Sequence, residues 1–266
     1  MKQKTEINGR KIAYALLGPE SAPAVVLGHS LGASAEMWGY QLPLLTSKFR
    51  VLVYDLPGHG DSDPPVGQDS FDDFANELAA LLDHVGIKRI ALVGLSIGGM
   101  IAQHFAFLYP DRLYALVLCS TGCQTNETGR KIFEDRIADV NERGIETQVD
   151  ASMTRWFTPA FAAAAPATID WVRSLYRKTS PAGFINGCRA IQELDTLDRL
   201  SSITVPTLVV PGEFDQAFPE SVSKTIQSRI KNAQLKFLTG AAHIGNIEQA
   251  HQFNEIIIKF LAEVLP

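Results

Sequence analysis

Short runs of aliphatic and β-branched residues alternate with helical patterns along the first half of the chain. Four such runs occur at residues 23–27 (PAVVL), 50–54 (RVLVY), 89–93 and 113–119. Between the second and the third run, large apolar residues recur at steps of three and four residues from Phe71 to Leu82, as in a helix with one buried face. Strands that alternate with helices pair in parallel, because each helix serves as a crossover. The chain is therefore predicted to form an α/β fold, with a mostly parallel central sheet flanked by helices.

The alternation stops after Cys119. About 80 residues pass before the next buried strand pattern at residues 207–210 (TLVV), whereas a simple crossover needs only one helix. The stretches between them, such as RKIFEDRIADV and INGCRAIQELDTL, have helical patterns of their own. A last strand is predicted at residues 235–238, followed by a closing helix with Phe253 and Phe260 on one face. We therefore expect a helical insertion over one end of the sheet.

The composition argues against several classes of protein. Hydrophobic residues make up 46% and charged residues 20% of the 266 residues, which is typical of a soluble globular protein, and no apolar run is long enough to span a membrane. Cys119, Cys123 and Cys188 cannot all pair and fit no metal-ligand spacing, so we expect reduced thiols, no bound metal and a cytoplasmic location. The start of the chain lacks the apolar stretch of a secretory signal. A net charge of −5 without basic clusters argues against a nucleic-acid partner.

The pattern G-x-S-x-G occurs twice, at residues 28–32 (GHSLG) and 94–98 (GLSIG). A turn that presents a nucleophilic serine needs a buried strand directly before it and a helix directly after it, because the strained turn lifts the side chain above the sheet edge. The second copy has both, since its helical pattern continues to about Leu108. The first copy has only the strand. Ser96 is therefore the expected nucleophile rather than Ser30, and the alternative is a glycine-rich turn that binds a phosphate or nothing.

A serine nucleophile needs a base, most often a histidine that is held by a carboxylate. His243 is the strongest candidate, because it follows the last strand in LTGAAHIGN, where a short loop reaches back over the strand ends. The acid is expected after the strand at residues 207–210, where Asp215 has the longer reach and Glu213 is the alternative. The other histidines fall within helical patterns or in glycine-flanked loops; the loop residues, His29 and His59, stay open as candidates.

The chain resembles the α/β-hydrolase fold family and, within it, the lactonase and esterase branch that includes 3-oxoadipate enol-lactonases. The resemblance covers nearly the whole length and rests on GHSLGASAEMW, YDLPGHGDSDPP, GLSIGGMIAQ, RWFTPAF, PTLVVPGEFD and AAHIGNIEQ. It implies a catalytic triad of Ser96, Asp215 and His243, in the chain order that this fold uses.

The resemblance also implies a division of the chain and an oxyanion hole. The core is expected at residues 1–120 and 204–266, and a helical cap at residues 121–203. In this family the loop after the first central strand supplies one backbone N–H of the oxyanion hole, which matches Leu31 here. The residue after the nucleophile, Ile97, supplies the other. This chemistry requires neither a metal nor an organic cofactor.

The implied reaction is hydrolysis of a small-molecule carboxylic ester or lactone through an acyl-enzyme, with a substrate like 3-oxoadipate enol-lactone as one candidate. Ser30, Trp38, Trp156 and Phe214 are the candidate substrate-contacting residues, although large aromatic residues at such positions are more often part of ordinary packing. One departure from the branch affects the choice of substrate, since many enol-lactonases in it carry Asn where His29 stands.

The charges of the expected cap leave its role open. The stretch of residues 155–189 contains one acidic residue, Asp170, and five basic residues: Arg155, Arg173, Arg177, Lys178 and Arg189. Such a cap either attracts a lactone that bears a carboxylate or presents ordinary solvated helix faces.

Two other functions fit the same candidate catalytic residues. A hydrolase of carbon–carbon bonds in a ring-cleavage dienoate would remove the substrate's conjugated absorbance, and a small-molecule receptor would bind a partner without turnover.

Overall fold

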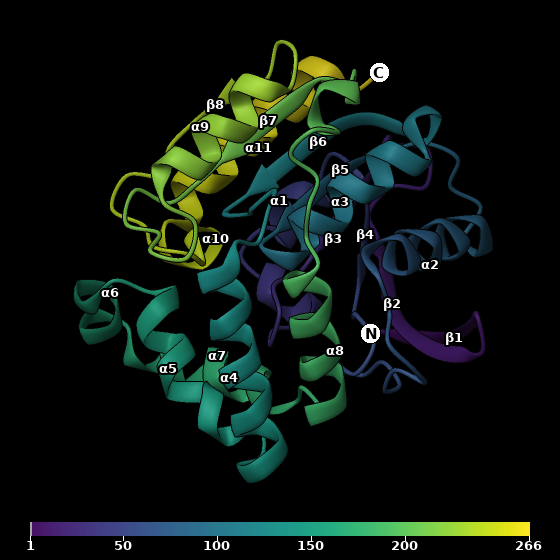
Figure 1. Ribbon diagram of the computed structural model, residues 1–266. Coiled ribbons are helices and arrows are strands. Elements are labelled where there is room, and N and C mark those ends of the chain that lie inside the picture. The colour runs from purple at the N-terminus through teal and green to yellow at the C-terminus, as the bar shows by residue number, and fades with distance from the viewer. Residues whose placement is uncertain (1) are drawn as a thin grey trace.

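The computed structural model describes residues 2–266 and contains an eight-stranded sheet of order β1-β2-β4-β3-β5-β6-β7-β8 (Figure 1). The strands are β1 (Gln3–Ile7), β2 (Arg10–Leu17), β3 (Ala24–Gly28), β4 (Arg50–Tyr54), β5 (Ile90–Leu95), β6 (Leu113–Cys119), β7 (Thr207–Val210) and β8 (Gln234–Leu235). The strand β2 runs antiparallel to both of its neighbours, and every pair from β4 to β8 is parallel. The predicted α/β class with a mostly parallel sheet is therefore confirmed.

The strand prediction omits the hairpin of β1 and β2 at the N-terminal edge. Asn8 and Gly9 form its turn with φ angles of 51° and 82°. Positive φ at both positions matches the twist of a two-residue hairpin, and an Asn-Gly pair is its usual sequence signal. The last strand also differs from the prediction, because β8 spans only Gln234–Leu235 instead of residues 235–238.

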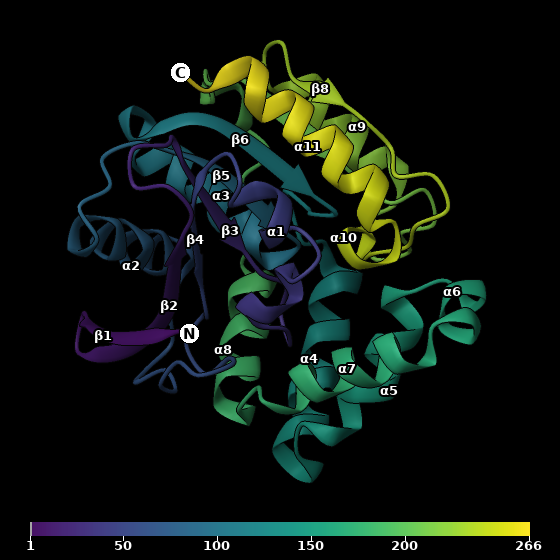
Figure 2. The same ribbon diagram turned by 180° about the vertical axis from the view of Figure 1, so that it is seen from behind.

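Helices cover both faces of the sheet. Figures 1 and 2 show α2, α3 and α9 over one face and α1 and α11 over the other. The helices outside the insertion are α1 (Leu42–Leu45), α2 (Phe71–His84), α3 (Ile97–Leu108), α9 (Glu220–Arg229), α10 (Gly245–Glu248) and α11 (Ala250–Val264). The helix α2 begins with a capping box, in which Ser70 and Asp73 bond each other's backbone N–H groups. Its buried face is the one expected from the sequence, including Phe71 and Leu82.

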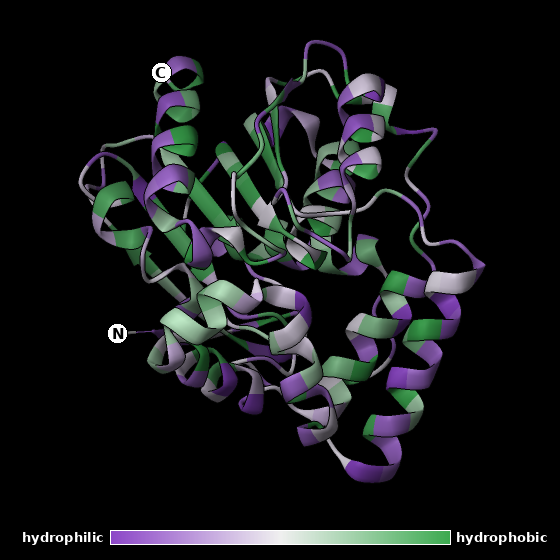
Figure 3. Ribbon diagram, turned by 90° about the vertical axis from the view of Figure 1, so that its left-hand side faces the viewer, coloured by the Kyte–Doolittle hydropathy of each residue, from purple (hydrophilic) through white to green (hydrophobic). Residues whose placement is uncertain are grey.

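Five helices between β6 and β7 form the inserted region, which we call the insertion. They are α4 (Glu127–Arg143), α5 (Glu146–Trp156), α6 (Pro159–Ala164), α7 (Pro166–Arg177) and α8 (Pro181–Gln192). The insertion lies beneath the sheet in Figure 1. Its helices show both hydrophobic and hydrophilic residues in Figure 3, whereas the strands are mainly hydrophobic. A helical region is thus inserted where the sequence predicts it.

The carboxyl ends of the parallel strands lie at the sheet edge that faces the insertion (Figure 2). The strands β3 to β7 are almost entirely buried, so their polar loops emerge only at the strand ends. In open α/β sheets, ligands bind at this carboxyl edge. The fold therefore brings the loops after β3, β5, β7 and β8 to a common place between the sheet and the insertion.

Candidate active site

Ser96 lies in a strained turn between β5 and α3. Its φ and ψ angles are 57° and −118°, which is rare for a residue with a side chain and costs about 1–3 kcal/mol. Glycines make the turn possible, because a Cβ atom on Gly94 would overlap the carbonyl oxygen of Gly98. The Ser96 N–H donates to the Cys119 carbonyl at 2.9 Å, and Thr121 Oγ1 donates to the Ser96 carbonyl at 2.7 Å. This context separates Ser96 from Ser30, which no helix follows directly.

His243 and Asp215 are hydrogen-bonded to each other. The Nδ1 atom of His243 lies 3.0 Å from Oδ2 of Asp215, and both side chains are buried. The other oxygen, Oδ1, accepts the N–H groups of Ala217 at 2.9 Å and Phe218 at 3.1 Å. Burial raises the pKa of the Asp215 carboxyl, but the charge and hydrogen bond of His243 and these N–H donors hold it below its usual range. Asp215 is therefore an ionised acceptor that orients the His243 ring.

Glu213, the alternative acid, has a different partner. Its Oε2 atom accepts the N–H of Gly240 at 2.9 Å, on the loop that leads to His243. A second glutamate fixes the same loop from the other side, and no motif in the sequence singled it out. The buried Glu248 accepts the Ala242 N–H through Oε2 at 2.8 Å and the Thr158 N–H through Oε1 at 2.9 Å. Glu248 thus ties the His243 loop to the insertion.

Ser96 and His243 line the same cavity, which has a volume of about 500 Å³. The loops of the core and the helices α4, α5 and α8 enclose it; its lining residues are Ser30, Leu31, Ser96, Met100, Gln124, Thr125, Asn126, Gly129, Ile132, Phe133, Arg136, Arg155, Trp156, Ile191, Gln216, Ala217, Phe218, Pro219, Val222 and His243. Of the expected substrate-contacting residues, Ser30 and Trp156 line it. Trp38 instead packs in the core against Phe253, and Phe214 is 56% exposed outside the cavity.

The loop after β3 is rigidly held beside Ser96. His29, fully buried, lies with Nδ1 2.8 Å from the Ser30 carbonyl, while its Nε2 accepts the Leu56 N–H at 2.9 Å. Because Nε2 is an acceptor, Nδ1 carries the proton and donates to Ser30. Burial lowers the pKa of His29, which favours this neutral form. Among residues 2–266, the N–H groups of Leu31 and Ile97 have no acceptor, so both are free to donate to a ligand.

Two arginines on the insertion also line the cavity, Arg136 of α4 and Arg155 of α5. Arg155 belongs to the basic stretch noted in the sequence, whereas Arg136 lies before that stretch and was not anticipated. Ion pairs hold other basic residues of the stretch away from the cavity: Arg173 with Asp150 and Asp170, Arg177 with Glu146, and Lys178 with Glu36. For these three residues the structure favours the reading as solvated helix faces.

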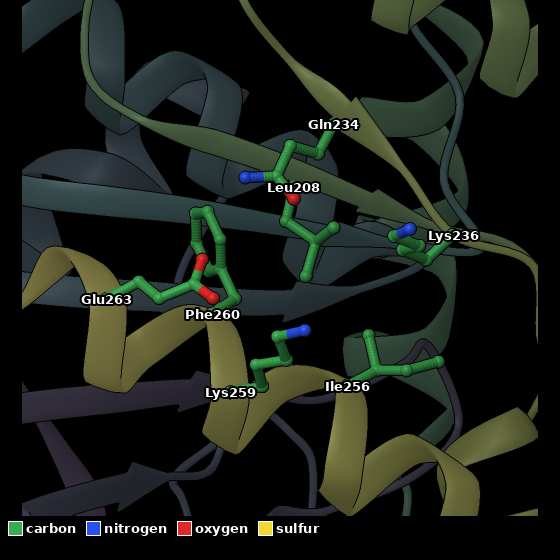
Figure 4. A pocket seen from close by; sticks show the side chains of 7 residues that line it. All are labelled: Leu208, Gln234, Lys236, Ile256, Lys259, Phe260 and Glu263. Carbon is green, nitrogen blue, oxygen red and sulfur yellow. The ribbon is translucent and has the colours of Figure 1, made fainter.

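A second hollow of about 170 Å³ lies between β7, β8 and α11 (Figure 4). Its lining residues are Leu208, Gln234, Lys236, Ile256, Lys259, Phe260 and Glu263. No serine, cysteine or histidine is found among its described lining residues, so it has no counterpart of the Ser96 and His243 pair. Within the described part of the chain, no group of three or more His, Cys, Asp or Glu residues is arranged to hold a metal ion. None of the helices in residues 2–266 is both long and apolar enough to span a membrane.

Comparisons with known proteins agree with this architecture. Residues 23–250 match the family model described as alpha/beta hydrolase fold. The chain is 31% identical to 3-oxoadipate enol-lactonase 2 of Acinetobacter baylyi, over 92% of this chain and 90% of that protein. It superimposes on the crystal structure of the enol-lactonase from Burkholderia xenovorans with a TM-score of 0.94 at 30% identity, over 98% of this chain and 100% of that one.

A related esterase has a similar structure. The malate-bound thermophilic esterase from Thermogutta terrifontis superimposes with a TM-score of 0.93 at 27% identity, and each chain is covered completely, at 100%. The family model spans most of the chain, and the similar proteins include both lactonases and an esterase. This chain therefore belongs to the alpha/beta hydrolase fold family.

Proposed function

We propose that the chain hydrolyses carboxylic esters or lactones, with Ser96 as nucleophile, His243 as general base and Asp215 as the acid that orients His243. One observation carries the proposal: the strained Ser96 turn and the His243–Asp215 pair, bonded at 3.0 Å, meet at one cavity. Titratable groups with shifted pKa values that converge at a cavity are typical of active sites. In this proposal residues 121–203 act as a cap over a core of residues 1–120 and 204–266.

The geometry supports the following reaction. His243 takes the proton of the Ser96 hydroxyl as its oxygen attacks the carbonyl carbon of the substrate. The free N–H groups of Leu31 and Ile97 donate to the oxyanion that forms. Protonated His243 then gives its proton to the leaving alcohol or enol oxygen, which leaves an acyl group on Ser96. Water, deprotonated by His243, releases the carboxylic acid and restores the serine.

The relatives suggest a lactone rather than a simple ester as substrate. Two proteins from Acinetobacter baylyi, 31% and 28% identical to this chain, are named as 3-oxoadipate enol-lactonases. An enol-lactone is a good substrate for such a site, because an enolate is a better leaving group than the alkoxide of a simple alkyl ester. We therefore propose an enol-lactone as the first natural substrate to test.

Removal of the Ser96 hydroxyl tests the proposal. We expect Ser96→Ala to lower kcat on 4-nitrophenyl butyrate and on a five-membered enol-lactone by at least about 10³-fold, since no nucleophile remains. Ser223→Ala is the matched control, because Ser223 is also a buried serine but lies on α9 outside the cavity. Full activity of Ser96→Ala on both substrates would refute the proposal. Turnover of a dienoate without lactone or ester turnover would favour carbon–carbon hydrolysis instead.

A further inference from the structure

The cavity has an unusual balance of charge. It contains the two guanidinium groups of Arg136 and Arg155, and no aspartate or glutamate is found among the lining residues of the described chain. A cation that is partly removed from water is costly unless an anion or several hydrogen bonds compensate it. The wall of the cavity therefore has two positive charges that no lining carboxylate neutralises.

Neutral groups hold Arg155 in place. Its Nη2 atom donates to Ser152 Oγ at 2.9 Å, and Ser152 in turn bonds the Tyr176 hydroxyl at 3.1 Å. Burial lowers the pKa of Arg155 to about 10, and the positive charge of Arg136 contributes in the same direction. Arg155 is thus still protonated at neutral pH, but its charge is only partly solvated and no carboxylate among the described residues neutralises it.

Arg136 is held in a similar way. Its Nε atom donates to Gln148 Oε1 at 3.1 Å, and its Cζ atom lies 5.2 Å and 5.0 Å from the ring centres of Phe133 and Phe184. Aromatic faces and an amide oxygen fix the direction of a guanidinium without removing its charge. Both arginines are therefore oriented in advance, and their mutual repulsion would be relieved by an anion that binds both.

Other arginines of the insertion either form ion pairs or lie outside the cavity: Arg130 and Arg189 form no ion pair among the described residues, but neither of them lines the cavity. Arg173, Arg177 and Lys178 all form ion pairs with acids outside the cavity. Among residues 2–266, neither Arg136 nor Arg155 forms an ion pair. In the described chain, Arg136 and Arg155 are the arginines of the insertion that line the cavity and also lack an acidic partner.

We propose that Arg136 and Arg155 form an anion subsite that binds a free carboxylate of the substrate while Ser96 attacks its ester or lactone carbonyl. This inference rests on the proposed function and narrows its substrate class to carboxylate-bearing esters and lactones. Guanidinium groups suit a carboxylate because they donate paired N–H groups in one plane. The subsite discriminates against uncharged substrates of the same size, since they leave both charges uncompensated.

A matched pair of substrates tests the subsite. Mono-4-nitrophenyl glutarate carries a free carboxylate, and its methyl ester is nearly the same size but uncharged. We expect the wild-type protein to prefer the carboxylate. Arg136→Gln and Arg155→Gln should each lower kcat/KM for it by about 10- to 100-fold, mainly through KM, while the methyl ester changes by less than about threefold. Equal losses on the two substrates would overturn the subsite and indicate a merely structural role.

Arg173→Gln provides the control, because Arg173 lies on α7 of the same insertion but pairs with Asp150 and Asp170 outside the cavity. It should leave the preference for the carboxylate unchanged. A loss of preference in Arg173→Gln equal to that in the cavity variants would attribute the effect to the general charge of the insertion and overturn the subsite.

Two further measurements separate this inference from the proposed function and from misfolding. Glutarate should inhibit the wild-type protein competitively at concentrations at least about tenfold lower than glutaramide, and equal inhibition would contradict the subsite. If the wild-type protein hydrolyses neither these esters nor the enol-lactone, the proposed function fails, and calorimetry with glutarate then judges the subsite alone. Binding that the double Arg136→Gln, Arg155→Gln variant weakens at least about tenfold supports it, whereas no binding or equal binding refutes it.

Discussion

His29 is a positioning residue for the oxyanion hole in the proposed reaction. Its Nδ1 atom donates to the Ser30 carbonyl at 2.8 Å, and that carbonyl belongs to the same planar peptide group as the Leu31 N–H. The Ala33 N–H donates to the same carbonyl at 3.0 Å. Because the peptide plane is rigid, bonds that fix its oxygen also fix the direction in which the Leu31 N–H points. The alignment of this donor therefore depends on a buried, neutral imidazole.

We expect His29→Leu to lower kcat by about 10- to 100-fold with little change in KM, since an oxyanion donor acts mainly in the transition state. His29→Asn should recover most of the rate, because its side-chain amide can donate to the Ser30 carbonyl. His59→Gln is the control, since His59 is a buried neighbour of His29 that bonds the Pro57 carbonyl instead. The interpretation is wrong if kcat falls equally in the Leu and Asn variants, or if KM alone rises.

At the level of elements, α8 packs so closely on the loop after β4 that glycine is needed on both sides. A Cβ atom on Gly183 would lie 2.7 Å from the Gly58 Cα and 2.8 Å from its carbonyl oxygen. The Ser180 N–H, just before α8, donates to this same carbonyl at 2.7 Å. The contact joins the insertion to the core through backbone atoms, which cannot rotate away as a flexible side chain can.

We therefore expect Gly183→Ala to lower the free energy of unfolding by about 1–3 kcal/mol in urea titrations, although alanine is the better helix former by about 1 kcal/mol. It should also raise KM, because α8 contributes Ile191 to the cavity wall. Gly67→Ala is the control, since a Cβ at Gly67 would meet no atom within 4 Å. Equal stability of the two variants would show that the insertion can shift without cost.

Local patterns predicted the Ser96 turn, because the strand before it and the helix after it are adjacent in sequence. Asp215 and His243 were chosen by their positions after predicted strands, and the structure places them 3.0 Å apart, in contact. Arg136 could not be found in this way. The helix α4 is polar along most of its length, with only Val140 buried, so nothing in its sequence tells which face meets the cavity. That face depends on how the insertion packs on the core.

Trp38 shows the same limit of local sequence patterns, because the sequence suggested a substrate contact there and the structure places it in the core. It follows the loop after β3 closely in sequence, but its ring is turned into the core, where it contacts Phe253 of α11 at a centroid distance of 6.0 Å. A tryptophan near a site contributes to either packing or binding, and only the position of a distant helix decides between them. Side-chain direction at the junctions of elements is therefore set by tertiary contacts rather than by local sequence.

At the scale of the whole molecule, His59 links folding to pH. It is 1% exposed, its Nδ1 donates to the Pro57 carbonyl at 3.0 Å, and its Nε2 has no partner among the described residues. Burial, with a contribution from His29, lowers the pKa of His59 to about 3 from 6.5. Between these two values the unfolded chain binds more protons than the folded protein, so stability rises with pH. The stabilisation is complete above pH 6.5 and is lost as the pH falls toward 3.

The replacement His59→Gln removes this proton uptake from the unfolded state. We expect the free energy of unfolding of the wild-type protein to fall between pH 7.5 and 4.5 in urea titrations, and to fall less in His59→Gln, whatever the stability of the variant at pH 7.5. His251→Gln is the control, because the His251 side chain is 89% exposed on α11, in contrast to the buried side chain of His59. If the free energy of unfolding fell as steeply with decreasing pH in His59→Gln as in the wild-type protein, His59 would accept a proton in the folded protein. The sheet edge that faces the insertion would then open to water at acid pH.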